Sequence, residues 1–451
     1  MGKINLEEPI IILGAGLSSG LMASYLGRRG FKVEVYERRP DPRTTDLYVG
    51  KSINLAISVR GLHAMADVGL EEQVRGMCIP MNGRMIHDRQ GNTDFQFYSK
   101  DGHKAINSIS RGDLNILLIN TADAHPNVNF HFDHRCVGMD LDTGEAQLVN
   151  ERTGESLRVK GQAAIACDGA FSGARGSMLR SPRFNFSQTY HPASYKELSF
   201  RPQDGGGWRV EKNALHIWPR GSFMLIALPN MDGSFTVTLF YPAIGPDSFE
   251  TLNSPEAVTA FFQKEFPDAL ALMPHLAEEF FANPTGELVT VKCDPWHHAG
   301  KCALVGDAAH AVVPFYGQGM NAAFEDCTVM NGCIAEGWTW EEVFAEYSRL
   351  RVANGQAIAD MAVDNYFEMR DRVGDPAWRF RKQIEHKLEK AFPERYVSRY
   401  ELVSFTRTPY AEALRRGFNN DEILLALAEG ISDVEQVDMA LADRLISEKL
   451  G

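Results

Sequence analysis

The chemically most informative stretch of the chain is a carboxylate followed closely by a glycine-rich turn. Residues 302–305 are apolar and predict a buried strand that carries Asp307 to its carboxyl end. A fixed carboxylate at that point can accept hydrogen bonds from sugar-like hydroxyl groups. Gly317 and Gly319 then predict a turn into a helix that begins near Met320. Unpaired N–H groups at the start of such a helix can bind a pyrophosphate or a developing anion.

The N-terminus supplies a second candidate phosphate site. Residues 9–13 form a short apolar run, followed by a glycine turn, a helical segment and a second strand at 31–37. The second strand ends in Glu37, 21 residues after Gly16. In dinucleotide-binding folds the pyrophosphate lies on the helix N-terminus, and an acid at this spacing accepts hydrogen bonds from the adenosine ribose.

Two details refine this nucleotide site. The third glycine position of the pattern is occupied by Ser19, which is small enough for close packing of helix on strand. Glu37 favours an unphosphorylated ribose, and therefore FAD rather than NADPH, despite the neighbouring Arg38 and Arg39.

A third segment has the pattern Asp-Gly-x-x-Ser-x-x-Arg at residues 168–175, directly after an apolar strand at 163–167. Taken alone, it also suits a strand end with a capped turn, because Asp and Ser both favour capping positions. Together, the three segments resemble the motifs of the flavin-dependent aromatic hydroxylases. The resemblance implies that Asp307 holds the ribityl chain of FAD, and that the segment beginning at Asp168 contacts both FAD and a transiently bound NADPH.

The resemblance assigns a set of motif positions to cofactor binding. These positions are Gly14, Gly16, Leu17, Ser18, Glu37, Arg38, Arg39, Arg111, Asp168, Gly169, Arg175, Asp307, Gly317, Gly319, Met320 and Asn321.

More specific strings are similar to the kynurenine-hydroxylating members of that family, along nearly the whole chain. They lie at residues 38–43, 50–56, 83–87, 195–198, 213–219, 229–230, 284–286, 314–321, 365–369 and 399–405. The substrate that the resemblance implies is L-kynurenine, which has an amino-acid tail, a ketone and an aniline ring.

The residue types suit that substrate. Arg84, Tyr98 and Tyr400 match the family's carboxylate-binding positions, and the planar fork of an arginine can bind a carboxylate through two hydrogen bonds. Asn365 matches a position near the polar tail, and Met369 lies one turn later on the same helical face. The side chains expected around the ring are Tyr195, Leu215, Met224, Ile226, Leu228, Phe240, Pro314 and Phe315.

Simpler roles for these residues stay open at this point. Arg84 could form a surface ion pair, Tyr98 and Tyr400 could be ordinary core tyrosines, and the apolar set could be core. One departure from the family lies at the centre of the site, because Tyr316 stands near the reacting ring where relatives carry His or Phe.

The resemblance implies hydroxylation at ring position 3 with NADPH and O2, through a C4a-hydroperoxyflavin, to give 3-hydroxykynurenine. No catalytic side chain is expected, because the aniline lone pair activates the ring carbon and the cofactor carries the chemistry. Two alternatives are a hydroxylase of another small aromatic acid, and a flavin-binding module without catalysis.

Composition limits the possible partners. A net charge of −13 argues against nucleic acid and anionic membrane surfaces. Seven scattered cysteines without a CxxC pair are typical of a reduced, cytoplasmic protein with no zinc site. The pairs His297–His298 and His131/His134 are interpreted as surface histidines.

No apolar run approaches the roughly 18 residues of a membrane span, and no secretion signal is evident. We expect a monomer or homodimer.

The fold class predicted is α/β, with interwoven domains. A Rossmann-like (GR2-type) FAD-binding domain would gather residues 1–75, 105–180 and 288–350. An antiparallel-sheet substrate domain would comprise residues 76–104 and 181–287, with strands at 216–219, 222–229 and 234–240. A C-terminal helical region would follow at 351–451, with helices at 356–372, 378–392 and 421–449.

Overall fold

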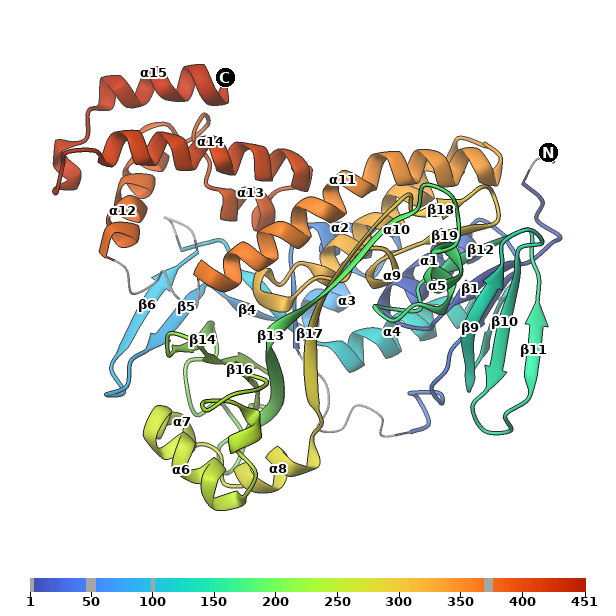
Figure 1. Ribbon diagram of the computed structural model, residues 1–451, viewed down its shortest axis with the longest axis horizontal. Helices are drawn as coiled ribbons and strands as arrows, with labels where there is room; N and C mark the ends of the chain where they lie inside the picture. Colours follow the sequence, from blue (N-terminus) through green and yellow to red (C-terminus); the bar gives the residue numbers. More distant parts are fainter. Residues whose placement is uncertain (1–3, 46–53, 99–101, 369–375) are drawn as a thin grey trace.

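The computed structural model describes residues 4–45, 54–98, 102–368 and 376–451 (Figure 1). Two large sheets form its framework. The six-stranded sheet has the order β18-β19-β12-β1-β2-β8 and is parallel except for the edge pair β18–β19. Its strands are β1 (Ile10–Leu13), β2 (Val33–Tyr36), β8 (Val128–His131), β12 (Ala163–Ala166), β18 (His297–His298) and β19 (Cys302–Leu304).

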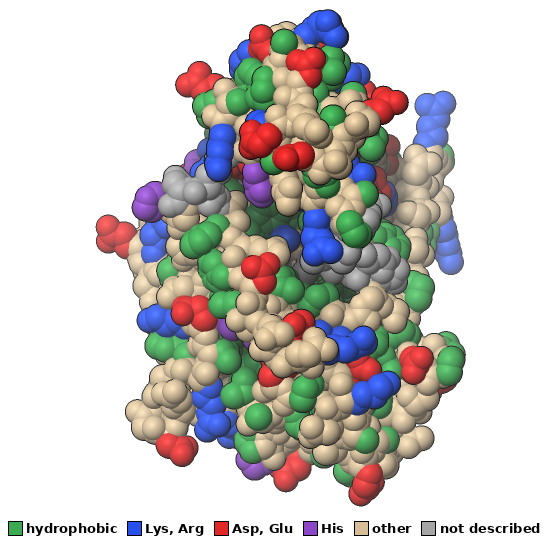
Figure 2. Space-filling view, turned by 90° about the vertical axis from the view of Figure 1, so that its left-hand side faces the viewer, with side chains coloured by type: hydrophobic (Ala, Val, Ile, Leu, Met, Phe, Trp, Pro, Cys, Tyr) green, Lys and Arg blue, Asp and Glu red, His purple; other side chains and the backbone are tan. Residues whose placement is uncertain are grey.

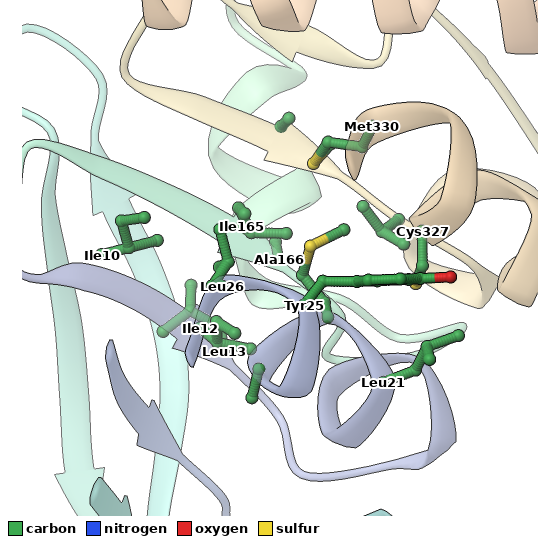
Figure 3. Packing of buried hydrophobic residues seen from close by; sticks show 14 of the residues in the cluster. Ile10, Ile12, Leu13, Leu21, Tyr25, Leu26, Ile165, Ala166, Cys327 and Met330 are labelled. Carbon is green, nitrogen blue, oxygen red and sulfur yellow. The ribbon is translucent and has the colours of Figure 1, made fainter. Parts of the chain in front are cut away.

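Both faces of this sheet are covered, and that explains its uninterrupted apolar strands. All residues of β1 and β12 are buried, as expected for parallel strands with helices on both sides. Figure 3 shows side chains of β1 and β12 packed with Leu21, Tyr25 and Leu26 of α1 and with Cys327 and Met330 of α10. The helices around this sheet are α1 (Leu17–Arg28), α4 (Arg111–Asp123), α5 (Gly173–Met178), α9 (Asp307–His310) and α10 (Gly319–Ala335).

The seven-stranded sheet has the order β17-β13-β16-β15-β14-β5-β6. Its strands are β5 (Gly83–His87), β6 (Thr93–Phe97), β13 (Asn185–Phe200), β14 (Ala214–Pro219), β15 (Met224–Pro229), β16 (Phe235–Pro242) and β17 (Thr285–Asp294). One face is covered by α6 (Pro255–Glu265), α7 (Pro267–Leu270) and α8 (Leu276–Ala282). Alternation along β14 divides its side chains: Trp218 packs toward these helices, whereas Leu215 and Ile217 face the opposite side.

Smaller elements connect the two sheets. One three-stranded sheet joins β3 (Asn54–Ile57), β7 (Ile106–Ser110) and β4 (Ile79–Met81), and another joins β9 (His134–Asp140), β10 (Glu145–Asn150) and β11 (Ser156–Val159). The remaining short elements are α2 (Val59–Asp67), α3 (Glu71–Gly76) and the 3-10 turns η1 (Phe249–Thr251), η2 (Pro314–Tyr316) and η4 (Val434–Gln436).

The C-terminal part is helical and has a small core of its own. Its helices are α11 (Trp340–Phe367), α12 (Pro376–Ala391), α13 (Arg399–Phe405), α14 (Tyr410–Ala428) and α15 (Met439–Leu450). Ile384 and Leu388 of α12 pack with Ile423 and Leu427 of α14 and with Ile446 of α15. Helices α12, α14 and α15 project from one end of the molecule, whereas α11 runs along its body (Figure 1). Among the described residues, no helix combines the length and apolar character needed to cross a membrane.

Several sequence predictions need correction. The single helix at 421–449 is wrong: α14 ends at Ala428, and Gly430 with a φ of 75° turns the chain before α15. The seven-stranded sheet is not wholly antiparallel, because β5 and β14 run parallel. The boundary placed at residue 350 falls inside α11, which continues to Phe367. The assignment of the other segments to two interwoven domains stays a prediction.

The four histidines interpreted as surface residues are half-buried. The His131 ring stacks on Tyr36 at 4.6 Å, and its Nε2 lies 2.6 Å from a carboxylate oxygen of Glu34. His298 lies beside the hydroxyl of Ser181. They are part of the packing, and among the described residues no group of three His, Cys, Asp or Glu is placed to hold a metal ion. All seven cysteines are free.

A buried charge cluster joins helices α2, α10 and α11. Asp326 of α10 is fully buried and accepts hydrogen bonds from Arg351 Nε of α11 (2.7 Å) and from the N–H of Gly306 (3.2 Å). His310 Nε2 also contacts the Asp326 carboxylate. Arg351 reaches Glu325 at 2.6 Å, and Glu325 in turn pairs with Arg60 of α2 at 2.6 Å. Breaking such a cluster leaves an uncompensated buried charge.

We therefore predict that Arg351→Met lowers the free energy of unfolding by about 3–5 kcal/mol, the typical result of removing one partner of a buried pair. Arg349→Met is the matched control, because Arg349 pairs with Glu346 on the exposed face of the same helix, with 68% of its own side chain exposed. Its expected loss is within about 0.5 kcal/mol. Urea unfolding of both variants, followed by circular dichroism, measures the difference. Equal losses would contradict the role given to the cluster.

Candidate active site

The N-terminal motif forms a turn with free backbone donors. Gly14 has a φ of 95°, and a Cβ there would lie 2.6 Å from the carbonyl oxygen of Cys167, so only glycine allows β1 to approach the strand end of β12. Helix α1 begins after Gly16 without any side-chain cap, and Leu17 and Ser18 form its first turn. The first N–H groups of this helix are therefore available to a ligand.

Glu37 lies beside this turn. Its carboxylate accepts hydrogen bonds from the N–H of Ala15 (2.7 Å) and of Arg39 (2.9 Å), which fixes it at the end of β2. A cavity of about 50 Å³ is lined by Gly16, Glu37, Arg39 and Arg111, among others. Arg38 is exposed next to it. These residues fit the adenosine and phosphate end of a dinucleotide, with an acid for the ribose and arginines near the phosphates.

Asp307 stands at the carboxyl end of β19, as the sequence predicted. Its side chain is exposed and forms no hydrogen bond or ion pair with any residue that the structure describes. Gly306, with a φ of 62°, brings this turn against α1, since a Cβ there would lie 2.9 Å from the hydroxyl of Ser18. The carboxylate is thus unoccupied by the protein and adjacent to the nucleotide turn, which suits a role in holding hydroxyls of a cofactor.

The segment around Asp168 is a capped turn and also leaves one carboxylate oxygen for a ligand, so both interpretations of its sequence pattern remain compatible with the structure. The turn is capped: Asp168 Oδ2 accepts from the N–H of Gly173 (2.9 Å), and Ser172 caps α5. Asp168 Oδ1, however, is buried without a described partner, so it could receive one hydroxyl donor. Burial raises the pKa of Asp168. Gly169, with a φ of 84°, forms the turn. The Arg175 guanidinium donates to backbone oxygens of Ala308 and Ala170, so it joins this turn to the Asp307 turn.

The glycine-rich turn leads from η2 into α10. Gly317 has a φ of 66°, and α10 begins at Gly319 with no side-chain cap, so its first N–H groups are also available. Met320 is buried. The Asn321 side chain is used within the protein, since Oδ1 accepts from the N–H of Ser58 and Nδ2 donates to the carbonyls of Ala56 and Gly317. Its expected contact with the cofactor would be indirect.

Arg84, Tyr98 and Tyr400 come together although they are distant in the sequence. The Arg84 guanidinium carbon lies 4.9 Å from the centroid of the Tyr400 ring and 5.6 Å from that of Tyr98. The two tyrosine rings stack at 5.4 Å, and Tyr400 stacks in turn on Tyr316 at 5.7 Å. Arg84 Nε and the Tyr98 hydroxyl are buried without a hydrogen-bond partner among the described residues.

Arg84 is half-buried and its Nε has no hydrogen-bond partner among the described residues, which favours a role in the site over the surface ion pair that was an alternative for it. Burial raises the pKa of Tyr98 well above its usual value, so its phenol stays protonated and can donate a hydrogen bond. A buried guanidinium N–H without a partner, next to a buried hydroxyl in the same state, is costly unless an acceptor joins them. The geometry suits a carboxylate ligand.

An aromatic and aliphatic face lies next to Arg84. In the sheet register Arg84 of β5 stands opposite Leu215 of β14. The same face carries Met224, Ile226 and Leu228 of β15 and Phe240 of β16. The centroid of the Phe315 ring of η2 lies 4.8 Å from that of Phe240, and the centroid of the Tyr195 ring lies 6.4 Å from that of Phe240. Pro314 precedes Phe315 in the same 3-10 turn.

Asn365 of α11 holds the 3-10 turn η2 in place through a hydrogen bond. Its Nδ2 donates to the carbonyl of Phe315 at 2.7 Å, and its neighbour Tyr366 packs its ring 4.3 Å from that of Phe315. Met369 lies outside the described residues. Sequence reasoning missed Tyr366, although it lies inside the matched string 365–369. It also missed Gly286, where a Cβ would lie 2.3 Å from the Tyr195 ring and would displace it.

Comparison with known proteins identifies the family and the fold of this chain. The family described as "FAD binding domain" matches residues 7–362. Among solved structures, 2-methyl-3-hydroxypyridine-5-carboxylic acid oxygenase is similar over 90% of this chain and 96% of its own, with a TM-score of 0.67 and 19% identity. PqsL of P. aeruginosa, solved in complex with 2-aminobenzoylacetate, is similar over 81% and 97%, with a TM-score of 0.64. At that identity the structures establish the fold. The chain is a flavoprotein with an FAD-binding domain.

Curated relatives place it within that class. The kynurenine 3-monooxygenase of Myxococcus xanthus is 48% identical over 444 residues, covering 98% of this chain and 96% of the relative. The kynurenine 3-monooxygenase of Dictyostelium discoideum is 45% identical and covers 99% of each chain. That of Stenotrophomonas maltophilia is 42% identical and covers 98% of this chain and 97% of the relative. The chain belongs to the kynurenine 3-monooxygenase family.

The free carboxylate of Asp307 generates a prediction about the cofactor. Asp307→Ala should purify largely without FAD and with a lower melting temperature, because loss of a ligand bound to the native state removes its stabilisation. Flavin absorbance per polypeptide and thermal unfolding check both effects. Asp204→Ala, in an exposed loop distant from these motifs in the sequence, is the control. A yellow Asp307→Ala protein with full FAD content and unchanged melting would remove Asp307 from the site.

Proposed function

We propose that this protein hydroxylates L-kynurenine at ring position 3, with FAD as cofactor and NADPH and O2 as co-substrates. The observation that carries the proposal is the half-buried Arg84, whose buried Nε has no partner among the described residues, packed against two stacked tyrosines and beside an aromatic face. A ligand that satisfies this site needs a carboxylate at one end and a flat apolar ring at the other. Kynurenine has both, and the full-length relatives carry its name.

In the proposed complex each part of the site has a separate task. Arg84 and the Tyr98 hydroxyl bind the substrate carboxylate, with the Tyr400 ring covering the guanidinium. Phe240 and Phe315 hold the ring against the sheet, and Asn365 keeps Phe315 in place through its backbone carbonyl. Positioning of this kind contributes to rate by converting an encounter into a fixed geometry.

Bound FAD would supply the oxygen-activating redox chemistry, held by the turns at Gly14, Asp168, Asp307 and Gly317. The residues of the chain then orient the ring and exclude water. No side chain is required as a strong base, because the aniline nitrogen of kynurenine already activates the adjacent ring carbon. Burial raises the pKa of Tyr316, so this residue stays a neutral phenol near the ring and cannot act as a phenolate base.

The alternatives differ in measurable ways. A hydroxylase of another aromatic acid would turn over a benzoate and ignore kynurenine, and a silent flavin-binding module would oxidise no NADPH with either compound. NADPH oxidation and product formation with and without kynurenine distinguish the three. No feature of the described residues favours either alternative over the proposed activity.

Arg84 provides the test of the substrate assignment. Arg84→Met keeps the apolar stem but leaves the substrate carboxylate unpaired, which costs about 2–5 kcal/mol. The kynurenine KM should rise about 30-fold or more, at about 1.4 kcal/mol per decade, while the FAD content stays normal. Arg84→Lys should recover part of the affinity, since a point charge lacks the bidentate fork.

The matched control for this test is Arg89→Met. Arg89 follows the same strand, is largely exposed and pairs with Glu265 at 2.8 Å, away from the tyrosine stack. Its KM should stay near that of the wild type. A wild-type KM in Arg84→Met would refute the carboxylate assignment and, with it, the strongest support for kynurenine.

A second prediction concerns reduction by NADPH. The motifs leave no separate NADPH domain, so delivery of hydride should depend on substrate-induced movement near the flavin, as closure motions control other enzymes. Stopped-flow reduction of the flavin should accelerate sharply when kynurenine is present. Analogues that bind without being hydroxylated should then release hydrogen peroxide. Equally fast reduction without substrate would show that no such control exists.

A further inference from the structure

A second cavity lies under the C-terminal helices, outside the Arg84 cluster. Its volume is about 390 Å³, and its walls come from the end of α11 and from α12, α13 and α14. The face shown in Figure 2 is hollowed beneath these helices. Tyr316, Asn365 and Tyr400 contribute to the cavity, and Tyr400 also covers Arg84. The cavity is therefore adjacent to the substrate site and is separated from it by these side chains.

The walls carry charges of both signs. Arg381 and Lys382 of α12 and Arg399 of α13 supply cations, and Glu368, Glu385 and Asp421 supply carboxylates. Lys382 pairs with Glu385 at 2.7 Å, and Arg399 lies 3.7 Å from Asp364, which is not part of the wall. Gly417 allows α14 to lie directly on Arg399, since a Cβ there would be 2.5 Å from the arginine stem. Packing of α14 thus holds Arg399 close to the cavity.

An unsatisfied polar group lies in the same wall. Asn420 of α14 is 2% exposed, and its Nδ2 donates to the carbonyl of Val397 at 2.9 Å. Its Oδ1 is buried without a hydrogen-bond partner among the described residues. Buried acceptors of this kind are nearly always satisfied, so an unpaired one in the wall of a charged cavity indicates a missing donor. An ammonium group would supply it after a small adjustment of α14.

The rest of the wall is apolar. Met361, Trp378, Leu424 and Leu425 contribute hydrophobic surface beside the charged groups. A volume of this size lies in the range of small-molecule sites. Lys382–Glu385 and Arg399–Asp364 already pair within the protein. A simple anion would supply no donor to the Asn420 acceptor, and an apolar compound would supply no partner to Arg381 or to Asn420. A ligand that supplies both partners and also covers the apolar wall is a zwitterion with a flat apolar group.

We propose that this cavity is an outer binding site for an aromatic α-amino acid, in series with the Arg84 site and separated from it by Tyr316, Tyr400 and Asn365. The ligand carboxylate binds Arg381 and its neighbouring cations, the ammonium group binds Glu368 and Asn420, and the ring lies against Trp378 and Leu425. A substrate held there is one side-chain movement away from the inner site. The proposal rests on the proposed function, because it assigns the outer site to the same class of substrate.

Calorimetric titration of the FAD-loaded enzyme with L-kynurenine, in the absence of NADPH, tests this site. The wild type should bind a second equivalent, and Arg84→Met should retain the outer equivalent while losing the inner one. Leu425→Trp should fill the outer cavity, and Arg381→Gln should weaken binding there at least tenfold. Ala426→Trp and Arg379→Gln are the matched controls, because each changes an exposed residue of the same helix that lies outside the wall. Both should retain the two equivalents.

The outcomes separate this proposal from the proposed function. A single equivalent in the wild type that Arg84→Met abolishes would overturn the outer site and leave the kynurenine assignment intact. Identical binding by Leu425→Trp and Ala426→Trp would also overturn it. If Arg84→Met kept two equivalents while Leu425→Trp lost one, the outer site would stand and the inner assignment would fail. Titration with L-tryptophan repeats the test of the outer site with an aromatic amino acid other than the proposed substrate.

Discussion

The buried carboxylate of Asp326 is the interaction on which the rest of the site depends. Burial alone would raise its pKa, but His310 and Arg351 hold that pKa below the usual value, so the group stays ionised. Through Gly306 it fixes the turn that presents Asp307, and through Arg351 it fixes α11 against α10. The Trp296 ring stacks on His310 at 4.8 Å and closes the cluster. A charge buried this deeply is tolerated only while all its partners are in place, so the cofactor turn and the helix that reaches the substrate site are maintained together.

The seven-stranded sheet places the guanidinium of Arg84 beside an apolar surface. Alternation along β14 and β15 sends Trp218 and Leu225 to the helix-covered face, and Leu215 and Ile226 to the site. The parallel pairing of β5 with β14 then sets Arg84 opposite Leu215. Slippage by one residue would exchange the two faces. In the proposed complex a bound carboxylate pairs with this guanidinium, so the register of β5 on β14 would contribute to the proposed preference for substrates with an acid group at one end.

The parts of this fold that the sequence predicts are those governed by local rules. The glycine turn after β1, the acid at the end of β2 and the strands β14 to β16 follow from short patterns of glycine and alternating apolar residues. The long strands β13 and β17 were missed, because they pair with each other across the intervening residues 201–284 and their partly polar sequences show no clear period. One helix was predicted across Gly430 because charged and apolar residues continue on both sides of it. The meeting of Arg84 with Tyr400 has no local signal at all, and only the family resemblance indicated it.

Helix α11 explains how such distant groups act as one unit. It has 28 residues, roughly 42 Å at about 1.5 Å per residue. Near its start Tyr347 donates to the carbonyl of Leu304 in the nucleotide-binding sheet, and Arg351 joins the Asp326 cluster one turn later. Near its end Asn365 holds Phe315 over the substrate face, and Glu368 reaches the outer cavity. The first half of α11 is thus held by the buried charge cluster, and its second half holds the turn that carries Phe315. In the proposed mechanism, entry of an amino acid to Arg84 would involve the side chains of Tyr316 and Tyr400, which lie between Arg84 and the outer cavity.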